Sequence, residues 1–144
     1  LRLPGTIPAG VRSNAVTSLI DIAPTILSIC GAEIPAEYVG RDLSLAFVDG
    51  QEFQNDPYRF FEHKPLGEWH QTVEFRGVVD DHYKYVFNLG DLDELYDLQA
   101  DPHERDNRVD APSYAVVRTR LKQRLLRWMR ETDDPLLHDL ESQM

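Results

Sequence analysis

The chain has 144 residues, of which 42% are hydrophobic and 28% are charged, and both fractions are ordinary for a globular protein. This balance excludes a disordered or fibrous chain, and the length is sufficient to bury a core without disulfides or metals. The 15 basic residues against 25 acidic ones give a formal net charge of −10. Such a surface repels phosphate backbones and anionic lipid, so we expect neither a nucleic-acid nor a membrane partner.

Cysteine content and hydropathy exclude further classes. The single cysteine, Cys30, rules out an internal disulfide and a cysteine-based zinc cluster. Asp21 and Pro24 interrupt the longest apolar segment, so no run approaches the roughly 18 apolar residues that span a bilayer. The chain begins with Leu1 rather than methionine, and we therefore expect it to be a piece of a longer protein.

The first predicted helix begins at Asp21, because an aspartate can accept hydrogen bonds from the free amides of the first turn. Apolar residues at spacings of four and three follow it: Ile22, Ile26 and Ile29. They predict one buried face, with Cys30 as a small filler on it rather than a nucleophile. Gly31 suits the helix end. A short strand is predicted at 15–18 and a helical turn before Gly50.

The middle of the chain alternates between apolar and polar residues, as strands do. Strands are predicted at 58–63, 72–79, 82–87 and 94–98, joined by tight turns into an antiparallel meander of three or four strands. We interpret the carboxylate pairs at 80–81 and 133–134 as exposed turn formers, because a general acid needs a dry pocket.

The last predicted element is an amphipathic helix of about five turns. Its apolar residues recur every three or four positions: Tyr114, Val117, Leu121, Leu125 and Trp128. The run Asp133-Asp134-Pro135 ends it. A small antiparallel sheet with a long C-terminal helix makes the fold class α+β.

Histidines and cations cluster around the end of the first predicted strand. The three histidines of this region lack the i, i+2 or i, i+4 spacing that aims two ligands from one element, so no metal site is assigned: His63, His70 and His82. Another grouping combines cations with an aromatic ring: His63, Lys64, Trp69, His70 and Arg76. Such a group can contact an anionic or sugar-like ligand, and the alternative is a solvated loop that Trp69 anchors to the core.

Five stretches, in order, match one pattern. They are Gly5 to Ser13, Val16 to Leu27, Gly40 to Leu43, Arg76 to Tyr85 and Glu94 to Asn107. Together they resemble the C-terminal third of the type I sulfatases, the formylglycine-dependent arylsulfatase family of the alkaline phosphatase superfamily. The second residue of the fourth stretch departs from the family, because Gly77 stands where threonine is usual.

The last of these stretches is a structural signature. In it we expect Tyr96 and Leu98 to face the core, and Glu104 and Asn107 to cap the backbone.

The resemblance implies two parts. Residues 1–50 are expected to be the exit segment and helix of the α/β sulfatase domain, and residues 51–144 a C-terminal antiparallel-sheet subdomain with its terminal helix. The parent protein would hydrolyse sulfate monoesters with a formylglycine and a divalent cation, usually calcium. This chain has neither site, since Ile34 stands where a formylglycine motif starting at Cys30 needs arginine. We assign no catalytic residue and no metal ligand, and expect no sulfate hydrolysis by the chain alone.

The implied partners are the catalytic α/β domain and, for the parent, a sulfate-ester small molecule or glycan. Substrate contact is assigned to a loop group defined as His63, Lys64, Trp69 and His70. Two alternatives remain: the C-terminal part of a phosphonate monoester or phosphodiester hydrolase of the same superfamily, and a stand-alone binding or structural module. Isolated, the chain is expected to self-associate through the apolar face that it normally docks.

Overall fold

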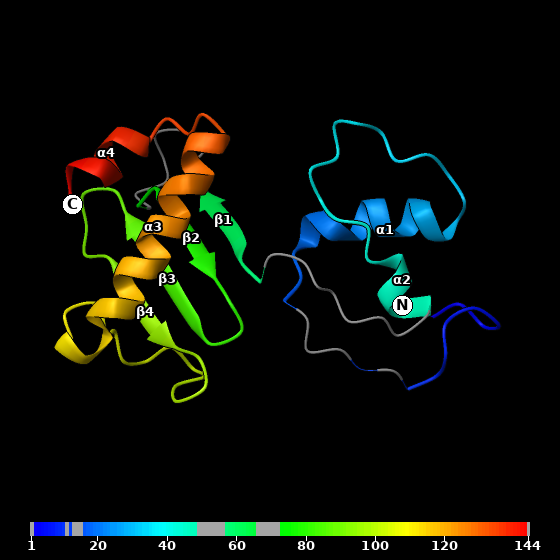
Figure 1. Cartoon of the computed structure of the whole chain (residues 1–144), viewed down its shortest axis with the longest axis horizontal. Coiled ribbons are helices and arrows are strands. Elements are labelled where there is room, and N and C mark those ends of the chain that lie inside the picture. Colours follow the sequence, from blue (N-terminus) through cyan, green and yellow to red (C-terminus); the bar gives the residue numbers. More distant parts are fainter. Residues whose placement is uncertain (1, 11, 13–15, 49–56, 66–72, 144) are drawn as a thin grey trace. The chain divides into compact units, whose positions relative to one another are not determined.

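The computed structural model describes residues 2–10, 12, 16–48, 57–65 and 73–143. The chain forms two compact units, Leu1–Pro57 and Tyr58–Met144, which are described separately (Figure 1). The expected division after residue 50 falls among residues 49–56, outside the described part, and stays a prediction.

The first unit is built from short helices. The 3-10 turn η1 (Leu19–Asp21) runs directly into α1 (Ile22–Ile29), and α2 (Ser44–Val48) follows after an irregular segment. Gly31, with φ +69°, lies just after the helix end, as predicted. The described part of the expected strand at 15–18 does not form a strand.

A buried carboxylate organises this unit. Asp21, only 2% exposed, accepts hydrogen bonds from the amides of Ser18 at 3.0 Å and Arg41 at 2.8 Å. The Arg41 guanidinium also ion-pairs with Asp21 at 2.7 Å. Burial raises the pKa of Asp21, but the hydrogen bonds from Arg41 and Ser18 outweigh it and hold the pKa below its ordinary value. The carboxylate thereby fastens the start of α1 to the segment that leads into α2.

The predicted apolar face of α1 is not buried within this unit. Ile22 is 50% and Ile26 43% exposed, whereas Pro24 and Thr25 are the buried residues of the helix. Cys30 is exposed too, so its predicted burial is wrong. The physical reason is that α1 packs on its other side, toward α2, and no described element of the unit covers the isoleucines.

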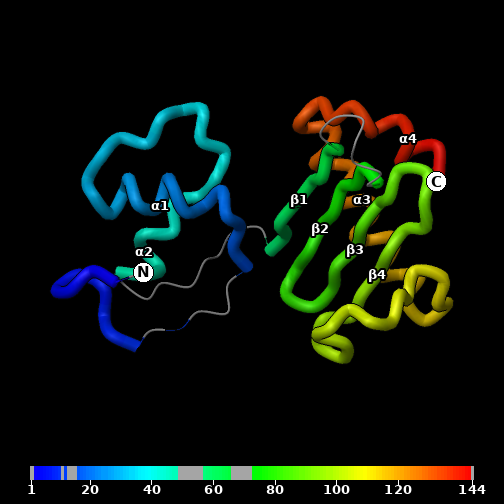
Figure 2. Tube along the Cα trace, turned by 180° about the vertical axis from the view of Figure 1, so that it is seen from behind, coloured from blue at the N-terminus to red at the C-terminus, as the bar shows by residue number. Residues whose placement is uncertain are grey.

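The second unit contains the predicted meander. Strands β1 (Arg59–His63), β2 (Phe75–Val79), β3 (Tyr83–Asn88) and β4 (Glu94–Asp97) form an antiparallel sheet in the order β1-β2-β3-β4. After the turn η2 (Pro112–Tyr114), α3 (Ala115–Glu131) lies across one face of the sheet. A short helix that the sequence did not predict, α4 (Leu137–Ser142), completes the unit. Figure 2 shows the opposite face, over which no helix of the described part lies.

The core lies between the sheet and α3. It consists of Val78, Tyr85, Phe87, Leu95, Val109, Leu121, Leu125, Leu126, Met129, Leu136 and Leu140. Phe60 of β1 stacks on Trp128 of α3 with ring centroids 4.9 Å apart. The predicted α+β architecture is therefore confirmed.

Among the described helices none is long and apolar enough to cross a membrane.

Two expectations for the Glu94 to Asn107 signature are wrong, those for Tyr96 and Glu104. Leu95, not Tyr96, enters the core, because the register pairs it with the buried Tyr85. Asn107 caps the backbone as expected, since its side-chain oxygen accepts from the Leu95 amide at 2.9 Å. Glu104 instead ion-pairs with Lys84 at 2.5 Å, across the face that α3 leaves uncovered.

Asp80 forms the predicted turn but is buried, not exposed. It is 5% exposed and accepts from the amides of His82 at 2.9 Å and Tyr83 at 2.6 Å. Arg120 of α3 closes over it with an ion pair of 2.9 Å. The turn is thus tied to the helix.

The space around Gly77 explains why glycine stands where the family has threonine. An added Cβ would lie 2.1 Å from the ring of Phe61 on the neighbouring strand, so the aromatic ring occupies the space that a side chain would need. We expect Gly77→Ala to destabilise the chain by about 1 kcal/mol, since overpacking costs ~1–3 kcal/mol and the alanine backbone returns ~0.5–1 kcal/mol. The measurement is the free energy of unfolding in urea. In a Phe61→Val background the same change should be neutral or stabilising, and an equal loss in both backgrounds would contradict this explanation.

The Asp21 network predicts an acid-sensitive first unit. Because the folded pKa lies below the ordinary 3.8, the stabilisation is present above that value and is lost as pH falls through the folded pKa. We expect Asp21→Asn to cost the first unit about 1–3 kcal/mol near neutral pH and to abolish this acid sensitivity. Amide exchange in α1, followed from about pH 6 down to about pH 2, measures both. The exposed Glu33→Gln should leave the profile unchanged, and an acid response that survives in Asp21→Asn would refute the assignment.

Candidate functional site

The described part of the loop group lies where β1 ends. His63 is the last residue of the strand, and its half-buried ring stacks on Phe75 of β2 with centroids 5.2 Å apart. Lys64 follows with a side chain that is 51% exposed, and it ion-pairs with Glu62 at 3.7 Å. An exposed ion pair at this distance is weak, so the ammonium group can still bind a ligand. The structure thus places both residues at one end of the sheet, where the imidazole lies against Phe75 and the ammonium group lies beside Glu62.

The other two residues of the loop group, Trp69 and His70, lie outside the described residues, and their assignment stays a prediction. His82 does not belong to the site, because the strand register places it at the opposite end of the sheet from His63. There it bonds to Asp97 at 3.1 Å and stacks on Tyr83. Within the described ranges no group of three His, Cys, Asp or Glu side chains could hold a metal ion.

Arg76, grouped with the ligand-contacting residues by sequence, is inaccessible to a ligand. Its side chain is 0% exposed and forms an ion pair with Asp134 at 2.6 Å. It also donates to Glu74 at 3.0 Å. Burial lowers the pKa of Arg76, but the bonds to these two carboxylates outweigh it and the net pKa is raised.

Asp134 is the residue that sequence reasoning missed. It was expected to be an exposed turn former, but its side chain is 4% exposed. The signal that points to it is Arg76 itself, because a charged residue in the run Phe75 to Val79 alternates onto the same face as Val78. A buried guanidinium requires an acidic partner from elsewhere in the chain.

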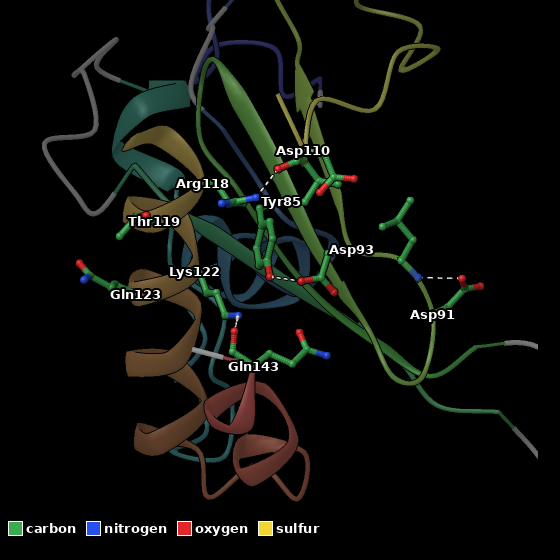
Figure 3. A pocket seen from close by; sticks show the side chains of 11 residues that line it. Tyr85, Asp91, Asp93, Asp110, Arg118, Thr119, Lys122, Gln123 and Gln143 are labelled. Atoms are coloured by element: carbon green, nitrogen blue, oxygen red, sulfur yellow. Dashed lines mark hydrogen bonds between the residues drawn. The ribbon is translucent and has the colours of Figure 1, made fainter. Parts of the chain in front are cut away.

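A second concave region lies between α3, the turn before β4 and the end of α4. It is an open cleft of about 520 Å³ whose side chains come from both the helix and the sheet (Figure 3). Tyr85 donates to Asp93 at 2.5 Å, and Lys122 donates to the carbonyl of Gln143 at 3.1 Å. Burial and this bond to Asp93 raise the pKa of Tyr85, while burial lowers that of Lys122. The first bond lies on the sheet side of the cleft and the second joins α3 to the end of α4. Because these polar groups already have partners, we assign the cleft no chemistry.

The first unit offers a different kind of surface. Its η1 and α1 present three apolar side chains at helical spacing to the surface of the unit: Leu19, Ile22 and Ile26, which are 84%, 50% and 43% exposed. We call this set the α1 stripe. A cleft of about 470 Å³ lies beside it and includes Leu43 and Phe47 in its lining. An apolar stripe of this kind suits contact with another protein surface.

Comparison with known proteins places the chain in a family. Residues 1–131 match the model described as N-sulphoglucosamine sulphohydrolase, C-terminal. The chain is 29% identical over 132 residues to the N-acetylglucosamine-6-O-sulfatase of Bacteroides thetaiotaomicron, a match that covers 87% of this chain and 23% of that protein. The chain spans about a quarter of the length of the curated relatives it matches.

Two solved structures have the same fold. BT4656, solved in complex with its substrate D-glucosamine-2-N,6-O-disulfate, superposes with a TM-score of 0.82 and 25% identity, covering 93% of this chain and 28% of that one. The phosphonate monoester hydrolase of Agrobacterium radiobacter superposes with a TM-score of 0.67 and 25% identity, covering 80% of this chain and 25% of that one. With a family match that runs from residue 1 to residue 131, the chain belongs to the N-sulphoglucosamine sulphohydrolase C-terminal family and is a sulfatase C-terminal domain.

Proposed function

We propose that the chain belongs to an enzyme that hydrolyses the sulfate monoester of a sulfated amino sugar, and that its own role is to support the catalytic domain and contact the substrate. The family match over residues 1–131 is the observation that carries the proposal. The substrate class is supported by the names of two matched proteins, one an N-acetylglucosamine-6-O-sulfatase and the other bound to a disulfated glucosamine.

The residues of this chain do not fit the groups that the family uses for the reaction. Exposed Cys30 is followed by Ile34 where a formylglycine motif needs arginine. The described residues hold no set of ligands for a divalent cation such as calcium. We therefore assign formylglycine and cation to the catalytic domain, and no step of the reaction to this chain.

Substrate contact falls to the end of β1. The His63 imidazole can donate a hydrogen bond to a sulfate or hydroxyl oxygen, and the Lys64 ammonium group can form a charge-assisted one. Both lie in a chain of net charge −10, where an anionic sugar is repelled elsewhere on the surface. Trp69 and His70 are proposed to complete the site as an aromatic platform and a further donor.

The contact predicts a binding defect. In the full-length enzyme, Lys64→Ala should raise KM for a sulfated glucosamine about tenfold or more with little change in kcat, because a hydrogen bond to a charged group is worth ~1.5–3 kcal/mol. His63→Ala should act in the same direction. Steady-state kinetics with the sulfated sugar and with a small aryl sulfate measure the effect, which should be larger for the sugar.

His82→Ala is the matched control, because it removes the same side chain at the opposite end of the sheet. It should leave KM unchanged. Unaltered KM in both the His63 and the Lys64 variants would refute the proposed substrate contact. Sulfate turnover by the 144-residue chain alone would refute the assignment of catalysis to the catalytic domain.

The α1 stripe is proposed to dock on the catalytic α/β domain. Three apolar side chains exposed together cannot be explained by packing inside the unit, and the matched relatives are about four times as long as the segment they share with this chain. These two observations support an apolar occupant that belongs to the same polypeptide. The expected self-association of the isolated chain follows from the same surface.

Truncating the stripe should affect the two forms of the protein differently. Ile22→Ala with Ile26→Ala should cost the isolated chain less than about 1 kcal/mol, since both residues are half exposed there. The full-length enzyme should lose ~2–5 kcal/mol per isoleucine, because buried contacts are removed. Urea unfolding of both forms measures the difference, and sedimentation should show less self-association of the isolated variant. Val116→Ala, 82% exposed on α3, is the control, and equal losses in both forms would exclude docking by the stripe.

The rival activity is hydrolysis of a phosphonate monoester or phosphodiester. It is favoured by the structural match to the phosphonate monoester hydrolase. Assay of the full-length enzyme with an aryl sulfate and an aryl phosphonate decides between them by the ratio of kcat/KM values. A stand-alone binding module would turn over neither substrate.

A further inference from the structure

One buried side chain gathers the segments around the proposed contact site. The Arg76 guanidinium lies on the side of the sheet that faces α3, with its Nε 2.6 Å from Asp134 and 3.6 Å from Glu62. Its terminal nitrogens donate to Glu74 at 3.0 Å, to the carbonyl of Phe75 at 2.9 Å and to the carbonyl of His63 at 3.4 Å.

These contacts connect three places along the chain. Glu62 and His63 are the last residues of β1, while Glu74 and Phe75 mark the start of β2. Asp134 comes shortly after the end of α3 and lies 58 residues from Arg76 in sequence. Figure 1 shows that the end of β1, the start of β2 and the end of α3 lie at the same end of the unit.

The acidic partner is itself held in place. Asp133 adopts a left-handed conformation with φ +51°, which aspartate tolerates better than most residues. The following turn lets Asp134 Oδ1 accept from the Leu136 amide at 2.8 Å, while its Oδ2 faces Arg76. One carboxylate therefore fixes both the start of the α4 region and the guanidinium.

Core stability alone does not call for this pair. Replacing a buried ion pair with apolar residues of similar size is often neutral or stabilising, because desolvating two charges is costly. An ion pair differs from an apolar contact in its direction, since its hydrogen bonds fix atoms at defined positions. The contacts that Arg76 makes beyond Asp134 are all to the two strand ends that flank the loop group.

We propose that Arg76 and Asp134 form a buried positioning pair that holds His63 and Lys64 in place at the end of β1. The substrate part of this role rests on the proposed function, whereas the positioning itself does not. Neither residue of the pair touches the substrate.

The first test is Asp134→Asn in the full-length enzyme. Loss of the charge should speed amide exchange of residues 62–64 about tenfold, because a local opening free energy falls by roughly 1.4 kcal/mol per factor of ten. KM for the sulfated sugar should rise about tenfold while kcat changes little. Asp80→Asn is the matched control, because it removes a buried charge from an arginine ion pair at the other end of β2. It should leave both the exchange of residues 62–64 and KM unchanged.

The second test separates positioning from stability. The double variant Arg76→Met with Asp134→Leu should unfold at the same or a higher urea concentration than the wild type, yet keep the fast exchange of residues 62–64 and the raised KM. Wild-type exchange of residues 62–64 in both Asp134→Asn and this double variant would overturn the proposal. Fast exchange with a wild-type KM would support the positioning pair and refute the substrate contact by His63 and Lys64, so the two proposals fail separately.

Discussion

The C-terminal unit is arranged around one fully buried charge. Arg76 is fully inaccessible, and a guanidinium in that position is stable only when carboxylates and carbonyls surround it. Asp134 lies 58 residues further along the chain, beyond α3, so the ion pair exists only where β2 and the segment after α3 come together. The ion pair therefore links sheet pairing, the end of the helix and the α4 region into one cooperative arrangement.

The two units reach stability by different means. The second encloses an apolar core between sheet and α3, with residues such as Phe87 and Leu125 fully buried. The first relies on the polar network of Asp21 and Arg41, while Leu19 of the α1 stripe remains 84% exposed. A unit that buries a carboxylate and exposes two isoleucines of its longest helix departs from the usual pattern of a complete domain. Its apolar surface is explained by the contact with the catalytic domain that we propose.

Local pattern predicted the long elements, and tertiary contacts decided what it missed. Period-two alternation identified the meander, and the spacing of Leu121 and Leu125 identified α3. The six-residue α4 is too short for a period to be recognised. Periodicity also found the apolar face of α1 but could not say whether it was covered, so the predicted burial of Cys30 failed. The strand end at His63 was predicted correctly, while its substrate contact stays a prediction. An ion pair between distant residues leaves no local pattern, so Asp134 was missed.

Charge distribution connects the acidic composition with the proposed site. Several cations of this chain already form ion pairs within the fold. Arg120 pairs with Asp80, and Arg76 pairs with Asp134. Lys64 differs, because its side chain is 51% exposed and its ion pair with Glu62 is long. The chain has a net charge of −10 and repels anions, whereas this exposed cation attracts them locally. The attraction for an anionic sugar is strongest where the cation lies beside other hydrogen-bond donors. A rigid strand end favours binding, because a cation held in place loses less conformational freedom on binding than one on an unsupported loop. We therefore regard the buried Arg76–Asp134 pair as the support of the strand end that carries the exposed Lys64.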